Sequence, residues 1–181
     1  MSSGEVDQEL ARIRGEIDAL VGVEDARRRA IESAIGKLAV FQIESDDARL
    51  AQKSLLQDMQ AAAMWNETVE SFATETGNAI ERVLTGSHTQ EAMTMHGMWE
   101  EFKQTRFNAY QFSKQALDTT NQVLVEAHNI RVDDPPVAQA HIDAHVEELS
   151  QLLHAALEAA TEAINYAQGS GGAGDQYRPR L

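Results

Sequence analysis

Cysteine is absent from this sequence of 181 residues, and proline and glycine are scarce, with 3 and 11 copies. Without cysteine the chain has no disulfide, no thiolate metal ligand and no thiol nucleophile, which excludes disulfide scaffolds, thiolate zinc and iron–sulfur sites, and thiol catalysis. Aromatic residues make up only 6% of the chain, and alanine supplies much of the 43% hydrophobic share. This composition favours long, closely packed helices over a thick globular core.

Positive charge is also in short supply. The chain has 15 Lys and Arg residues against 29 Asp and Glu residues, a net charge of −14. We expect no nucleic-acid partner, because phosphate binding requires a basic surface. No stretch approaches the roughly 18 uncharged apolar residues of a membrane span, and the first residues lack the basic and apolar regions of a secretory signal. We therefore expect a cytoplasmic protein without a membrane span.

Apolar residues recur at heptad spacing along nearly the whole chain, which predicts an all-α fold. The first run is Val6, Leu10, Ile13, Ile17 and Leu20. Gly22 then predicts a break between two helices. A second run keeps the spacing from Leu55 to Val83 and predicts one unbroken helix, with Asn66 and Thr76 as polar positions within the pattern.

The later helix boundaries are also marked in the sequence. Gly86 predicts a helix end in a left-handed turn, and Ser87 with Gln90 predicts a capping box for the next helix. Asp133-Asp134-Pro135-Pro136 predicts the start of a last helix. The predicted segments are an N-terminal coiled-coil region (1–40), a long helical hairpin (41–132), an acidic C-terminal helix (133–168) and a disordered tail (169–181). We expect an elongated antiparallel helical bundle or coiled coil that is oligomeric, since Ala-rich faces bury little surface within one chain.

The most informative cluster combines methionine with aromatic residues. Its members fall within an arc of about 140° on a helix: Met95, Trp99, Phe102, Phe107 and Tyr110. One interpretation is a core layer that faces two neighbouring helices. The other is an exposed surface that binds a hydrophobic partner, with flexible Met and amphipathic Trp and Tyr as adaptable contacts. The sequence leaves both interpretations open.

The remaining constellations do not indicate an enzyme. His141, His145 and Glu148 share one stripe of the last helix and provide only part of a metal site. No histidine is preceded by glutamate at the three-residue spacing of di-iron carboxylate bundles. Phosphate-binding glycine loops, nucleophile elbows and metalloprotease helix motifs are missing. We interpret Arg27-Arg28-Arg29 as an exposed basic run. We expect no catalytic residue, no cofactor and no metal.

One part of the chain resembles a known family. A Gln/Ala/Glu-rich helix, with the sequence Leu55-Leu56-Gln57-Asp58-Met59-Gln60-Ala61-Ala62-Ala63, runs toward a short break. Thr89-Gln90-Glu91-Ala92-Met93 then opens a second long helix with Tyr110 inside it. In these features the stretch from Phe41 to Ala127 resembles the phasins, amphipathic proteins that coat polyhydroxyalkanoate storage granules. It departs from them at Thr89-Gln90, where phasins often carry Asp-Pro.

The resemblance implies a non-enzymatic coat protein associated with granules in the cytoplasm. Its partner would be the polyhydroxyalkanoate granule surface, bound through the cluster from Met95 to Tyr110, while acidic surfaces repel neighbouring granules. Two alternatives remain open. The chain is also compatible with a coiled-coil structural or adaptor protein of a larger assembly, or with a noncatalytic activating subunit of a polyhydroxyalkanoate synthase.

Overall fold

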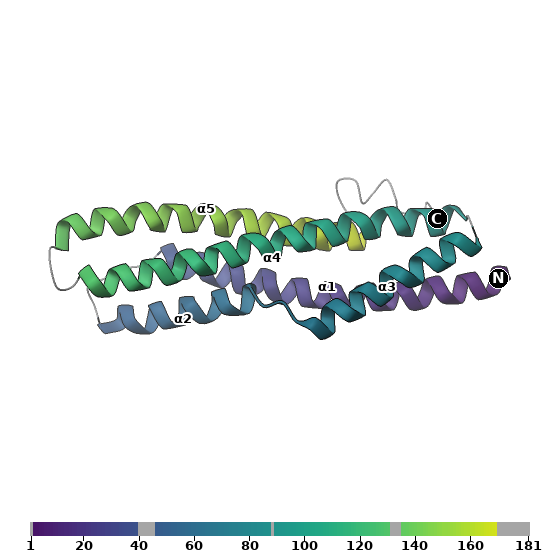
Figure 1. The fold of residues 1–181 in the computed structure, drawn as a ribbon, viewed down its shortest axis with the longest axis horizontal. Helices are drawn as coiled ribbons and strands as arrows, with labels where there is room; N and C mark the ends of the chain where they lie inside the picture. The colour runs from purple at the N-terminus through teal and green to yellow at the C-terminus, as the bar shows by residue number, and fades with distance from the viewer. Residues whose placement is uncertain (1, 40–45, 88, 131–134, 170–181) are drawn as a thin grey trace. The chain divides into compact units, whose positions relative to one another are not determined.

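The computed structural model describes residues 2–39, 46–87, 89–130 and 135–169, with side chains at 2–39, 52–87, 89–126 and 143–169. These residues form five helices (Figure 1): α1 (Ser3–Ala39), α2 (Asp46–Ala62), α3 (Glu67–Gly86), α4 (Gln90–Ile130) and α5 (Pro135–Gln168). The described residues contain no strand. The prediction of an all-α helical bundle with long helices is confirmed. None of the helices, as far as they are described, is long and apolar enough to cross a membrane.

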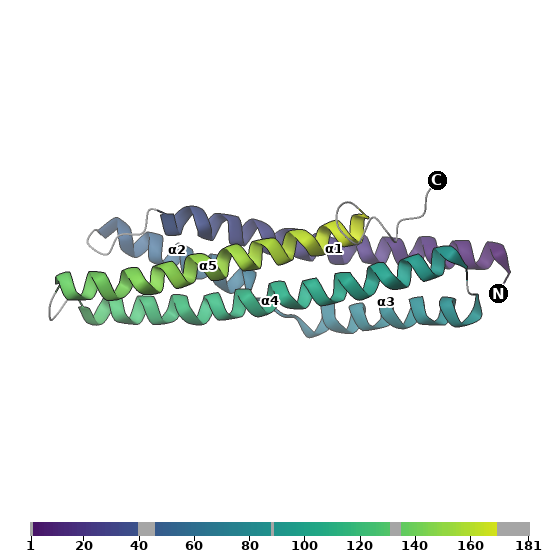
Figure 2. The ribbon, with the colours of Figure 1, turned by 90° about the horizontal axis from the view of Figure 1, so that it is seen from above.

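The helices form two compact units, and α1, α4 and α5 each contribute to both. The first unit comprises Met1–Asp25, Trp65–Phe107 and Ala159–Leu181. The second unit comprises Ala26–Met64 and Asn108–Glu158. In the second unit, α4 and α5 lie side by side with opposite chain directions in both views (Figures 1 and 2). Each unit combines stretches that are distant in sequence, and the division into four segments stays a prediction.

The core of the first unit is built from the predicted heptad positions. The apolar residues that α1 contributes are Val6, Leu10, Ile13, Ile17, Leu20 and Val21. They pack in one cluster with Ile80 and Val83 of α3 and Ile164 of α5. Thr76 is a buried polar member of the α3 pattern, and its hydroxyl oxygen lies 3.0 Å from both the Phe72 carbonyl and the Glu16 carboxylate. The apolar spacing therefore identifies the buried face correctly.

The second unit has a core of smaller side chains. Its buried residues are Ile31, Ala34 and Leu38 of α1, Leu55, Met59 and Ala62 of α2, Ala109, Ala116 and Val123 of α4, and Leu149, Leu153 and Ala156 of α5. The buried Ser113 and Thr120 hydroxyls each donate to a carbonyl one turn earlier in α4, at 2.7 Å. Alanine, serine and threonine at buried positions leave little side-chain volume between the helices, as the composition predicts.

Two of the predicted helix boundaries inside the chain are wrong. Gly22 does not interrupt α1, which continues from Ser3 to Ala39. A single glycine in a helix interior costs about 0.5–1 kcal/mol relative to alanine, too little to end a long packed helix. The predicted unbroken helix from Leu55 to Val83 is instead two helices, α2 and α3. Asn66, predicted as a core position, caps α3 by accepting a hydrogen bond from the Thr68 N–H at 2.8 Å.

The predicted caps around the turn between α3 and α4 are also wrong. The Thr89 hydroxyl, rather than Ser87, accepts the hydrogen bond from the Ala92 N–H, at 3.1 Å. Thr89 is one residue before α4, where a cap side chain reaches the free N–H groups of the first turn. Gly86 does not adopt a left-handed conformation. Among the described residues only Gly169, directly after α5, has a positive φ, 69°.

Gly77 of α3 provides a test of the core packing. A Cβ atom at this position would lie 2.9 Å from Nε1 of the buried Trp99 ring. We expect Gly77→Ala to lower the free energy of unfolding by about 1–3 kcal/mol, because the ring must shift in a packed core. Gly22→Ala is the matched control: its Cβ meets nothing within 4 Å, and it should stabilise the protein by about 0.5–1 kcal/mol. Urea denaturation measures both. Equal stability of the two variants would contradict the packing of Trp99 on Gly77.

Candidate functional site

The methionine–aromatic cluster does not form one surface. Met95, Trp99 and Phe102 are buried in the first unit, with 4%, 4% and 0% of their surface exposed. Phe107 is 45% exposed in the same unit, and Tyr110 is half-buried in the second unit. Met95, Trp99 and Phe102 are therefore core residues, as the first of the two interpretations predicts. Their role in binding a hydrophobic surface stays a prediction, one that requires the first unit to open.

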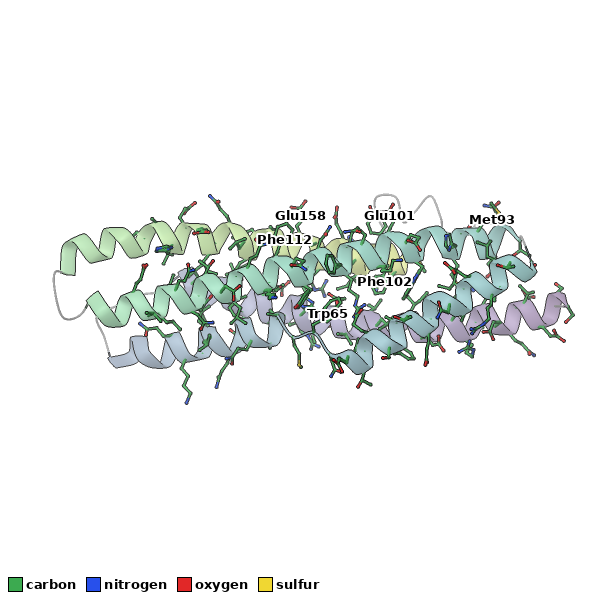
Figure 3. The ribbon with its side chains drawn as sticks, viewed as in Figure 1. Trp65, Met93, Glu101, Phe102, Phe112 and Glu158 are labelled. Carbon is green, nitrogen blue, oxygen red and sulfur yellow. The ribbon has the colours of Figure 1, made fainter. Side chains whose placement is uncertain are left out.

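The burial of Trp99 and Phe102 follows from their heptad positions and from the absence of a side chain at Gly77. Their rings lie 5.9 Å apart, centroid to centroid, and both belong to the core cluster that includes α1 and α3 residues. Figure 3 shows Phe102 on the inner side of α4, whereas Met93 projects away from the helices on the opposite side. The wide apolar arc of α4 is thus largely a contact with neighbouring helices of its own unit.

Four large hydrophobic side chains are exposed among the described residues: Met64, Met93, Phe107 and Val125. Met93 and Phe107 belong to the first unit, and Met64 and Val125 to the second. Phe107 contacts Trp65 edge to face, with ring centroids 6.3 Å apart. Single exposed apolar residues are common on soluble proteins. The pair of Trp65 and Phe107 joins two aromatic rings, one of them exposed.

A buried charged group, Arg106, lies beside this aromatic pair in the first unit. Arg106 Nε is 3.2 Å from Glu24 Oε1, and the two residues are 4% and 0% exposed. A second guanidinium nitrogen is 2.5 Å from Glu70 Oε1 of α3. The Trp65 ring covers the guanidinium at 4.8 Å. One arginine of α4 therefore joins α1, α3 and the aromatic pair. The sequence shows Arg106 only as a charged residue at a heptad position.

A second arginine, Arg27, is buried in the second unit, with 4% of its surface exposed. The interpretation of Arg27-Arg28-Arg29 as an exposed run is therefore wrong for Arg27. Its guanidinium donates to the backbone carbonyls of Ala62 and Met64 and lies 5.9 Å from the Tyr110 ring centroid. The carbonyls at the end of α2 explain this placement, because the last carbonyls of a helix lack intrahelical partners.

The histidine stripe of the last helix is described only in part, because the side chain of His141 lies outside the described residues. His145 Nε2 is 3.1 Å from Glu126 Oε2 of α4, and His145 Nδ1 is 3.8 Å from Glu148 Oε2. The side chains that the structure describes include no group of three or more His, Asp or Glu residues able to hold a metal ion.

Exposed charge on α1 stabilises the helix and does not create a site. Arg12 Nε donates to Glu9 at 3.2 Å, and the same guanidinium pairs with Glu16. The hydrogen bond from Arg12 lowers the pKa of Glu9 below its usual value of 4.5. Any stability from this shift is present above that value and is lost as the pH falls through the lowered pKa. The Arg12 side chain is 49% exposed, so solvent weakens the interaction.

The comparisons with known proteins do not assign a family. No family model matches the sequence, and no curated protein matches it.

Two of the three phenylalanines of α4, Phe102 and Phe107, distinguish core from surface. We expect Phe102→Glu to abolish cooperative folding or to destabilise the protein by more than about 4 kcal/mol, because it buries an unpaired carboxylate. Phe107→Glu should change the free energy of unfolding by about 1 kcal/mol or less, since the ring is 45% exposed and a charge there stays in contact with water. Chemical denaturation followed by circular dichroism measures both changes. A stable, folded Phe102→Glu variant would contradict the burial of this ring.

Arg106 gives a second test. Arg106→Ala should cost about 3–5 kcal/mol of stability, because it removes a buried guanidinium that pairs with both Glu24 and Glu70. Lys103→Ala on the same helix is the control. Its pair with Glu100 is exposed on both sides, and such pairs contribute about 0–1 kcal/mol. Thermal and urea denaturation measure the free energy of unfolding of both variants. Similar decreases for the two variants would contradict a stabilising role of the buried Arg106 pairs.

Proposed function

We propose that this protein is a non-catalytic helical bundle that acts through protein–protein contacts, as a structural or adaptor component of a larger assembly. The burial of Met95, Trp99 and Phe102 in the first unit supports this choice over direct adsorption to a hydrophobic surface. A side chain that already packs inside its own unit has no apolar area left to offer a second partner.

The energetic cost of exposing these rings is large. A buried aromatic side chain covers about 150–250 Å², and at about 25 cal/mol per Å² each ring contributes about 4–6 kcal/mol. Exposing Trp99 and Phe102 together therefore approaches the whole free energy of unfolding of a typical domain, about 5–15 kcal/mol. A coat protein that used this face would have to recover the cost through contacts with the granule.

The exposed charge of α5 favours a basic protein surface as the partner. From Pro135 to Gln168 the sequence contains no lysine or arginine. The described acidic residues that α5 exposes are Asp143, Glu147, Glu148, Glu158 and Glu162. Charge of one sign over such a surface speeds association with an oppositely charged partner and disfavours partners of the same charge.

The granule coat is the second candidate, and the composition of the core is the observation that favours it. Glu24, Thr76 and Arg106 are buried in the first unit. Buried ionic and polar groups contribute less to stability than apolar groups of the same volume, which lowers the cost of opening. In this second proposal the first unit opens on the polymer, and Met95, Trp99 and Phe102 bind it together with Phe107 and Tyr110. A synthase-activating subunit is a variant of the same candidate.

Particle binding separates the two functions. The purified full-length protein is mixed with polyhydroxybutyrate particles and centrifuged, and light scattering gives the oligomeric state of the free protein. The adaptor proposal predicts that the protein stays in the supernatant as a discrete species. Pelleting with the particles, together with changed tryptophan fluorescence, would contradict it and support the coat.

Phe107→Glu is the matched variant in the particle assay. The change adds a charge to the exposed ring and leaves the buried face of α4 intact. Reduced pelleting of this folded variant would assign particle binding to the surface around Phe107. Unchanged pelleting, with amide protection of α3 and α4 lost on the particles, would assign it to the opened first unit.

A further inference from the structure

Methionine supplies all the sulfur of this chain, because the sequence has six methionines and no cysteine. A peroxide therefore meets no thiol, and the thioether sulfur of methionine is the side-chain atom that it oxidises reversibly. The product, methionine sulfoxide, is polar, whereas methionine is apolar. The place of each methionine in the fold consequently decides whether oxidation changes the surface or the core.

The described methionines fall into an exposed set and a packed set. Met64 of the second unit is 60% exposed, and Met93 of the first unit is 51% exposed. Met59 and Met95 are buried, with 0% and 4% of their surface exposed, and Met98 packs against the core cluster of the first unit. Figure 3 shows Met93 projecting away from the helices. Each unit therefore presents a methionine to solvent and also holds one in its interior.

The hydrogen bonds of the two exposed methionines use main-chain atoms. The Met64 carbonyl accepts from the Arg27 guanidinium at 3.4 Å. Met93 lies in the first turn of α4, and its N–H donates to the Thr89 carbonyl at 3.1 Å. These bonds do not involve the sulfur atoms, so an oxygen added to either exposed sulfur can be hydrated while the bonds remain. The same oxygen on a buried methionine would place a polar group in a packed interior, which destabilises the fold.

We propose that Met64 and Met93 are oxidation sites, at which a peroxide converts one exposed apolar side chain of each unit into a polar one while the fold stays intact. The sulfur attacks one peroxide oxygen, and an S–O bond forms as the O–O bond breaks. The sulfur gives up a pair of electrons, and hydrogen peroxide is reduced to water.

Oxidation at these sites changes the surface that a partner meets. Met64 and Met93 are two of the four large hydrophobic side chains that are exposed among the described residues. The reaction therefore leaves Phe107 and Val125 as the apolar members of that set. This inference goes beyond the proposed function and does not depend on the identity of the partner.

The first experiment treats the full-length protein with hydrogen peroxide and locates the added oxygen by tandem mass spectrometry. We expect Met64 and Met93 to react at least about tenfold faster than Met59 and Met95, because a buried sulfur reacts only when its unit opens. Oxidation of either buried methionine at the rate of the exposed pair would overturn the proposal. The same treatment in concentrated urea is the control. All four should then react at similar rates, and a preference that persists in the unfolded chain would also overturn the proposal.

The second experiment measures the fold and the surface after oxidation of the exposed pair. The circular dichroism spectrum and the midpoint of urea denaturation should be unchanged, because no packed side chain is modified. Retention on a hydrophobic-interaction column should fall, because two exposed apolar side chains have become polar. A lower urea midpoint would contradict an intact fold, and unchanged retention would contradict the effect on the surface. Either result would overturn the proposal.

Leucine replacement provides the matched variant. Met64→Leu combined with Met93→Leu keeps apolar side chains of similar volume at both exposed positions and removes their sulfur atoms. Peroxide treatment should leave the column retention of this double variant unaltered, whereas the unsubstituted protein elutes earlier. An equal loss of retention in the double variant would assign the change to other residues and overturn the role of Met64 and Met93.

Discussion

The contact between the Trp99 indole and Gly77 governs what the first unit can do. With no side chain at Gly77, the ring lies against the α3 backbone and leaves only 4% of the Trp99 surface exposed. Met95 and Phe102 lie on the same face of α4 and are buried with it. These three residues of the predicted arc are therefore packed inside the first unit, and this packing is why we propose a partner bound through the outer, charged faces.

Charged residues in the interior share one physical task. Arg106 joins three parts of the first unit through Glu24, Glu70 and Trp65. Arg27 supplies donors to carbonyls at the end of α2 in the second unit. Each guanidinium presents several donors in a fixed plane, so that one buried side chain can satisfy several acceptors.

Local sequence signals failed where two of them competed. Asn66 continues the apolar spacing of α2 and is also a preferred N-cap residue, and in the structure it caps α3 while Arg27, distant in sequence, donates to the Ala62 carbonyl. Between Ser87 and Thr89 the sequence offers two hydroxyl caps, and only the start of α4 decides between them. No local pattern indicates which residue from another helix will satisfy a backbone group.

Composition and spacing alone predict the helical class, the absence of thiol chemistry, the acidic charge and the apolar face of each long helix, because these signals act within a few turns. The packing of the helices is needed to show that Trp99 and Phe102 face inward, that Arg27 is buried, and that α2 ends at Ala62. These outcomes depend on contacts between helices distant in sequence. An amphipathic pattern shows which face of a helix is apolar, whereas the fold determines which other helix packs against that face.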